Sequence, residues 1–137
     1  MPWYPVGVVA KDPQPNTPEL CTRFHYASEL IGRRWNGAII FMLLKQTCRF
    51  ATLRDGIPDI TDRMLSERLQ ELEQEGVVER VVVPETPVRV EYSLTKKGRA
   101  LAGAIDSIAN WAEKYIAVPA ARKPAKKSVR AAKSAVR

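Results

Sequence analysis

Residues 61–76 read TDRMLSERLQELEQEG, and this stretch decides the fold. It opens with a threonine that can cap a helix and closes with a glycine that can stop one. At about 100° per residue, the side chains of Leu69 and Leu72 fall within about 40° of that of Leu65. The pattern predicts an amphipathic helix that packs on a core through its leucines and leaves a polar face outside.

The segments around this helix predict a helix-turn-helix. A short helix is expected in residues 51–58, ATLRDGIP, ended by Gly56 and Pro58. After Gly76, the sequences VVERVVVP and VRVEYSLT have the valine content and alternation of strands, and the proline-rich PETP between them forms an exposed loop. A helix pair followed by such a hairpin indicates a winged helix-turn-helix, whose second helix enters the major groove of DNA.

Further helices are expected on both sides of this motif. Residues 19–32 show helical spacing, and Asn36 can cap an apolar, buried second helix. A last helix is expected over residues 96–117, with apolar side chains at a 4-3 spacing. The predicted fold class is therefore α+β, a winged helix-turn-helix domain in which two helices precede the helix pair and one follows the hairpin.

The polar face of the helix over residues 61–76 carries side chains suited to base edges. Arginine can take guanine in a bidentate pair, glutamine can do so with adenine, and glutamate can accept from cytosine. The other interpretation is an ordinary solvated helix face, and the neighbouring elements favour DNA reading. The expected recognition residues are Thr61, Arg63, Ser66, Glu67, Arg68 and Gln70.

The hairpin loop is the expected wing. Arg89 follows it and can reach the minor groove or its phosphates, with Arg80 and Arg49 as further phosphate contacts. The alternative for Arg89 is an ion pair with Glu79 or Glu85 across the strands.

Four segments together resemble one known family. ELIGRRW at 29–35, RFATLRDGIPDIT at 49–61, MLSERLQELEQEGVVER at 64–80 and PETPVRVEYSLTKKGRAL at 84–101 are similar to the HxlR-type winged helix regulators of bacteria. The resemblance covers about residues 20–117 in unbroken register. It implies a cytoplasmic homodimer that regulates transcription from a pseudo-palindromic operator, and we expect such a protein to be associated with the nucleoid.

The resemblance also implies that the first and last helices form the dimer interface. The aromatic content of the last helix agrees, because such anchors are enriched at interfaces. Packing of the two helices within one domain is the other interpretation, and both can hold. The expected interface residues are Leu20, Phe24, Ala27, Leu101, Ile105, Ile108, Trp111, Ala112 and Tyr115.

Two departures from the family stand out. Asp62 and Glu67 replace glutamine-rich chemistry at the start of the recognition helix, so the operator preference should differ from that of relatives.

Where relatives have Cys-Pro, this chain has Cys21-Thr22. Some members sense oxidants or electrophiles such as quinones or aldehydes with that cysteine. A helix N-terminus and Arg23 both favour a reactive thiolate at Cys21, and an inert thiol buried at the dimer interface is the alternative. Cys48 is expected to be structural, with a Cys21–Cys48 disulfide left open.

The excess positive charge lies at the C-terminal end. The 137 residues carry 22 Lys+Arg and 15 Asp+Glu, a net charge of +7. All seven excess basic residues lie in residues 118–137, which contain no acid. We expect an extended arm over 1–18, a folded domain over 19–117, and a disordered tail over 118–137 that binds DNA without sequence preference. A merely solubilising tail is the alternative. Its basic residues are Arg122, Lys123, Lys126, Lys127, Arg130, Lys133 and Arg137.

Several other classes of protein are disfavoured. His25 is the only histidine, so a two-histidine metal site is ruled out, and no glycine-rich phosphate loop is visible. We therefore expect no catalysis, cofactor or metal. No transmembrane run or signal peptide is expected. The expected partners are double-stranded DNA, a second copy of the chain, and a small-molecule or oxidant inducer. The alternatives are a nucleoid-type architectural protein that relies on its tail and a winged helix that binds proteins.

Overall fold

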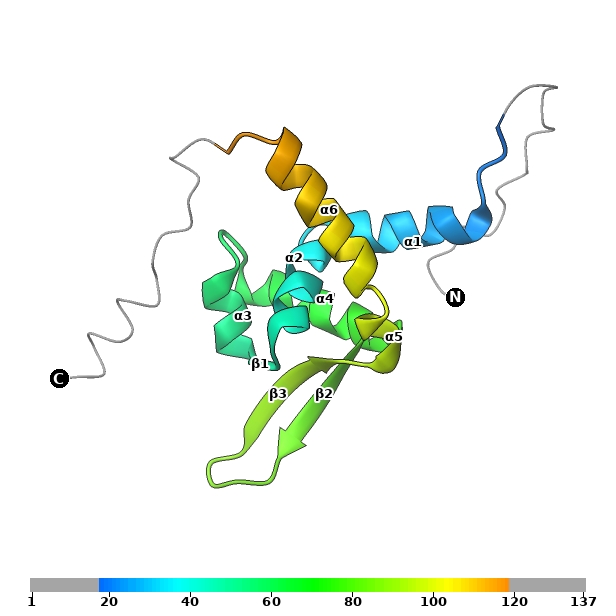
Figure 1. Ribbon diagram of the computed structural model, residues 1–137. Helices are drawn as coiled ribbons and strands as arrows, with labels where there is room; N and C mark the ends of the chain where they lie inside the picture. Colours follow the sequence, from blue (N-terminus) through cyan, green and yellow to red (C-terminus); the bar gives the residue numbers. More distant parts are fainter. Residues whose placement is uncertain (1–17, 119–137) are drawn as a thin grey trace.

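A computed structural model describes residues 18–118 of the chain. The expected N-terminal arm and basic tail, with every basic residue named in the tail, lie outside these residues except for Pro18 and Val118. The described part follows the predicted order of helices and hairpin (Figure 1). Its elements are α1 (Thr22–Gly32), α2 (Asn36–Lys45), β1 (Cys48–Arg49), α3 (Phe50–Gly56), α4 (Asp62–Gln74), β2 (Val78–Val83), β3 (Arg89–Leu94), α5 (Lys96–Arg99) and α6 (Ala102–Tyr115).

Helix α4 begins and ends as the sequence predicts. The Thr61 hydroxyl accepts a hydrogen bond from the amide of Met64 at 3.1 Å, which satisfies one of the free donors at the helix start. Gly76 adopts a left-handed conformation, with φ of 76°, just after the helix. The chain can therefore turn there without the steric cost of a Cβ atom.

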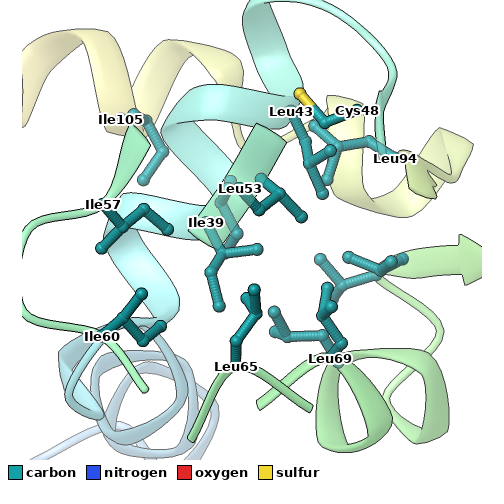
Figure 2. Packing of buried hydrophobic residues seen from close by; sticks show 14 residues of the cluster. Ile39, Leu43, Cys48, Leu53, Ile57, Ile60, Leu65, Leu69, Leu94 and Ile105 are labelled. Atoms are coloured by element: carbon teal, nitrogen blue, oxygen red, sulfur yellow. The ribbon is translucent and has the colours of Figure 1, made fainter. Parts of the chain in front are cut away.

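The core lies between the helix pair, α2 and the base of the hairpin. Figure 2 shows Ile39 of α2, Leu53 of α3 and Leu65 of α4 turned toward one another. Ile57 and Ile60, in the turn between α3 and α4, are also buried, so the turn is held by packing as well as by its hydrogen bonds. The core consists of Ile39, Ile40, Leu43, Cys48, Leu53, Ile57, Ile60, Leu65, Leu69, Leu72, Val77, Val78, Leu94 and Ile105.

The sheet has one strand more than the sequence predicts. β2 and β3 form the expected antiparallel hairpin, and β1 adds to the free side of β3, giving the order β1-β3-β2. β1 contains only Cys48 and Arg49, which is too short for alternation to reveal it. It fixes the start of α3 against the wing, because Arg49 is also the residue that precedes α3.

Two predictions about helix ends are wrong. Asn36 does not cap α2: its side chain is fully buried and donates to the carbonyl of Leu30 at 2.8 Å, which ties α2 to the end of α1. The last helix is not continuous from residue 96. It breaks after Arg99, and α6 starts at Ala102.

The break after α5 follows from a tight junction at Gly98. Thr95 accepts a hydrogen bond from the Gly98 amide at 3.1 Å and donates to the carbonyl oxygens of Gly76 and Val77. A Cβ atom on Gly98 would lie 2.2 Å from the Val77 carbonyl oxygen, so only glycine fits. The junction thereby joins the end of α4 to the chain that leads into α6.

Candidate nucleic-acid interface

Four of the six predicted recognition residues of α4 are exposed to solvent. Arg63, Ser66 and Gln70 are exposed, and the Arg63 side chain is 88% accessible. Thr61 lies at the N-terminal end, where free amide groups favour phosphate. Because Leu65, Leu69 and Leu72 hold the other side of the helix in the core, this polar face is available to a partner.

The two acids on this face are paired with arginines. The Nε of Arg63 donates to Oε1 of Glu67 at 3.2 Å, one helical turn away. Asp62 lies 3.7 Å from a terminal nitrogen of Arg54 on α3. The pairing offsets the negative charge that would repel phosphates. The pair engages only the Nε of Arg63, so both of its terminal NH₂ groups are left out of this contact.

Arg68 is not on the outward face. Its side chain is 8% exposed overall, and Nη1 donates to Oε2 of Glu71 at 2.8 Å. A long side chain that starts at the flank of a helix can fold back over the apolar face and bury its stem. The prediction that Arg68 contacts DNA is therefore wrong for this structure.

At the wing, Arg89 pairs with acids on its own hairpin. Its guanidinium lies 3.4 Å from Glu85 Oε1 and 2.9 Å from Glu91 Oε1. The sequence suggested ion pairs of Arg89 with Glu79 or Glu85 as alternatives to a DNA contact. The pair with Glu85 is formed and the pair with Glu79 is not. The pair with Glu91 was not predicted. Glu79 instead accepts from the hydroxyl of Ser93 at 3.2 Å. Arg89 therefore stiffens the base of the wing.

Arg49 and Arg80 lie on opposite faces of the sheet. Arg49 is opposite Glu91, whereas Arg80 is opposite Tyr92, the next residue of β3. Side chains of successive strand residues point to opposite faces. Arg49 therefore shares the face of Arg89, and both line a hollow of about 300 Å³ beneath the wing loop. Neither Arg49 nor Arg80 forms an ion pair within residues 18–118.

Apolar side chains are exposed along α1 and α6, at the end of the molecule away from the wing (Figure 1). None of the eleven residues of α1 is buried, although the helix carries Phe24. On α6, the rings of Trp111 and Tyr115 pack at a tilt of 41°, with their centroids 5.8 Å apart. The exposed set is Leu20, Phe24, Ile108, Trp111, Tyr115, Ile116 and Val118.

Three predicted interface residues lie elsewhere or are less exposed. Ile105 belongs to the core, with 6% of its surface exposed, and Leu101 packs against that core. Ala112 is partly buried. The 4-3 stripe of the last helix thus serves two purposes, because its first turn fills the core and its later turns face outward.

The two cysteines differ in surroundings. Cys21 is exposed and lies at the N-cap of α1, as expected from the sequence, and Cys48 is buried in the core. Both are free thiols. Burial raises the pKa of the Cys48 thiol above its ordinary value, so this thiol stays protonated and is a poor nucleophile.

Within residues 18–118, no group of three or more His, Cys, Asp or Glu side chains is arranged to hold a metal ion. No helix in that range is long and apolar enough to cross a membrane.

Known proteins of similar sequence and fold are helix-turn-helix regulators. The model of the HxlR-like helix-turn-helix family matches residues 30–119. YvaP of Bacillus subtilis, an uncharacterised HTH-type transcriptional regulator, is 50% identical over 101 residues, which cover 74% of this chain and 94% of YvaP. The reduced form of the B. subtilis transcriptional regulator YodB has 45% identity and a TM-score of 0.65, over 72% of this chain and 96% of that one. The redox regulator HypR in its oxidised form has 35% identity and a TM-score of 0.67, over 70% and 99%.

Proposed function

The chain belongs to the HxlR-like helix-turn-helix family of transcriptional regulators, and we propose that it acts as a homodimer on a pseudo-palindromic DNA operator. The observation that carries the proposal is the outward face of α4. This helix is capped at its N-terminal end by Thr61, anchored by three leucines, and exposes Arg63 on the side away from the core. Helices of this kind read the major groove with their N-terminal half.

Arg63 is the main base-reading residue in this proposal. Its Nε is held by Glu67, which leaves the two terminal NH₂ groups in the fork that matches O6 and N7 of guanine. Glu67 therefore orients the arginine rather than opposing DNA. Ser66 and Gln70 extend the same face and can donate to bases or phosphates.

The wing contributes contacts to the DNA backbone. Arg49 and Arg89 share one face of the sheet beside the wing loop, and Arg80 extends from the other face. Of these, Arg89 is paired with the carboxylates of both Glu85 and Glu91, so Arg49 and Arg80 supply most of the available positive charge. Contacts of this kind set the register of a protein on DNA without reading sequence.

Dimerisation would bury the apolar face of α1 and α6. Most helical stability comes from packing, and among the apolar residues of α1 only the partly buried Leu30 and Ile31 pack on the core of their own protomer. A second copy that covers Phe24, Trp111 and Tyr115 would supply that packing and place two α4 helices on one side of the dimer. Two recognition helices on one operator then explain a pseudo-palindromic site.

Cys21 is the proposed sensor of oxidants or electrophiles. It is exposed at the start of α1, the helix of the proposed interface, and the fold is shared with the redox regulator HypR. A modified thiol at this position would alter the packing of α1 against its partner copy. The inducer would thereby change the affinity for DNA through the packing of α1, without contacting α4.

Replacement of Cys21 tests this role. Cys21→Ser should bind the operator as the wild type does and should no longer release it when diamide or a quinone is added, because the nucleophile is gone. Cys48→Ala is the matched control and should keep the response, since burial protects that thiol. Fluorescence anisotropy with labelled operator, with and without oxidant, measures both. Release of DNA by oxidised Cys21→Ser would remove Cys21 from the sensing step.

Selection of bound sequences from random DNA tests the function as a whole. The full chain and a chain truncated after residue 117 should enrich the same two-fold symmetric sequence. The truncated chain should bind all sequences more weakly by a similar factor, because the basic residues it lacks contact only phosphates. An architectural protein would instead enrich nothing and would lose most of its binding with the tail.

A further inference from the structure

Helix α1 contacts the recognition helix directly, through polar side chains. The hydroxyl of Tyr26 on α1 donates to Oε1 of Glu75, at the C-terminal end of α4. Arg33, which follows α1, lies with Nη2 at 3.0 Å from Oε1 of Glu71. A helix that buries none of its eleven residues is thus joined to α4 at two separate points.

The two points define one seam between the helices. Glu71 and Glu75 are four residues apart and lie on the same side of α4. Tyr26 and Arg33 are seven residues apart, about two turns, and so face the same side of α1. One contact would let the helices pivot about each other. Two contacts at different positions along the helix axes restrict both the separation of the helices and their rotation.

Glu71 is held in place from within its own helix. Its Oε2 accepts from Arg68 at 2.8 Å, and its Oε1 faces Arg33, the residue that follows α1. Arg68 is nine-tenths buried, so its charge depends on this carboxylate for compensation. The position of Glu71 is therefore fixed relative to the rest of α4. A displacement of Arg33 would thus act on α4 itself and not only on the Glu71 side chain.

We propose that Tyr26 and Arg33 are positioning residues for DNA recognition, which set the place of α4 relative to the dimer face of α1. The base-reading residues Arg63 and Ser66 lie on the same α4, two to three turns before the seam. In a dimer, the two α1 helices are fixed to each other, so the seams fix the distance between the two α4 helices. That distance determines which half-site spacing fits. The proposal rests on the proposed dimeric regulator.

The test uses the full chain, the enriched operator, and two further operators with one base pair inserted or removed between the half-sites. The main variant is Tyr26→Phe combined with Arg33→Ala, which removes both contacts from the α1 side and leaves the Arg68–Glu71 pair intact. Arg34→Ala is the charge-matched control, because Arg34 is the exposed neighbour that lies over the Trp35 ring and, within residues 18–118, forms no ion pair with α4. Arg33→Lys keeps the charge and should retain much of the wild-type behaviour.

The double variant should lose about tenfold in affinity at the selected spacing, equivalent to ~1.4 kcal/mol. Its preference among the three spacings should shrink, while its affinity for random DNA and its dimer mass stay unchanged. Arg34→Ala should behave as the wild type. A folded, dimeric double variant that keeps the wild-type spacing preference would overturn the proposal.

Two other results of this experiment also distinguish the seam from the proposed function. If the double variant fails to fold or dimerise, Tyr26→Phe alone carries the test, since it removes one oxygen atom and keeps the ring. A reduced spacing preference then supports the seam, and an unchanged one overturns it. If the wild type enriches no sequence at all, the proposed function fails, whereas an enriching wild type with an unaffected double variant removes only the positioning role.

Discussion

Trp111→Glu should convert the protein from a dimer to a monomer and weaken operator binding by about a hundredfold or more. The side chain is 57% exposed in the protomer, so a charge there costs little in the isolated domain. In the proposed dimer, the same charge would be buried in an apolar contact with Tyr115 and the facing copy, at a high desolvation cost. A monomer has only one α4, so it loses the additional affinity that a dimer gains by binding both half-sites of the operator at once.

Sedimentation velocity gives the mass, and anisotropy with the enriched operator gives the affinity. Val81→Glu is the control for mass, because Val81 is an exposed valine on β2, and this strand runs away from α1 and α6 (Figure 1). It should remain dimeric. A Trp111→Glu protein that sediments as a dimer would show that α6 is not the interface and that its apolar face has another role.

Gly98→Ala should lower the free energy of unfolding by about 2–4 kcal/mol. Its Cβ would lie 2.2 Å from the carbonyl oxygen of Val77 and 3.0 Å from Cδ2 of Leu94. The carbonyl cannot retreat easily, because it accepts the backbone amide of Thr95 at 3.0 Å. The junction between α4, β3 and α5 would have to open, and a loss of this size is a large part of the stability of a small domain.

Gly103→Ala is the matched control. Apart from its chain neighbours and the backbone of its own helix, no heavy atom lies within 4 Å of the position of its added Cβ, and the residue is inside α6. Alanine is favoured over glycine in a helix by about 0.8–1.0 kcal/mol, so this change should stabilise the protein slightly. Urea denaturation of both variants gives the comparison. Equal small effects at the two positions would mean that the close approach at Gly98 relaxes without cost.

The sequence predicted the elements whose signals are local. The leucines of α4 recur at the spacing of one helix face, and Thr61 and Gly76 mark its ends, so its bounds could be read directly. The valine-rich strands around PETP gave the hairpin in the same way. β1 was missed because two residues carry no periodicity, and it exists only because β3 offers a free edge.

The errors at the site arise where one pattern serves two partners. Arg68 lies at the flank of α4, and nothing in its spacing tells whether its long side chain turns out to DNA or back to Glu71. Ile105 continues the stripe of α6, yet its turn is the one that faces the core. The seam of Tyr26 and Arg33 had no signal either, because contacts between helices far apart in sequence leave no fixed spacing.

The central claim is that α4 reads bases through Arg63, and the affinity of Arg63→Ala for the operator and for random DNA tests it most directly. The variant should lose about 1–3 kcal/mol on the operator and stop discriminating at one base pair per half-site, where guanine faces the arginine. Its affinity for random DNA should change little. An equal loss on the operator and on random DNA would contradict the claim, because Arg63 would then contact phosphates and α4 would not read sequence through it.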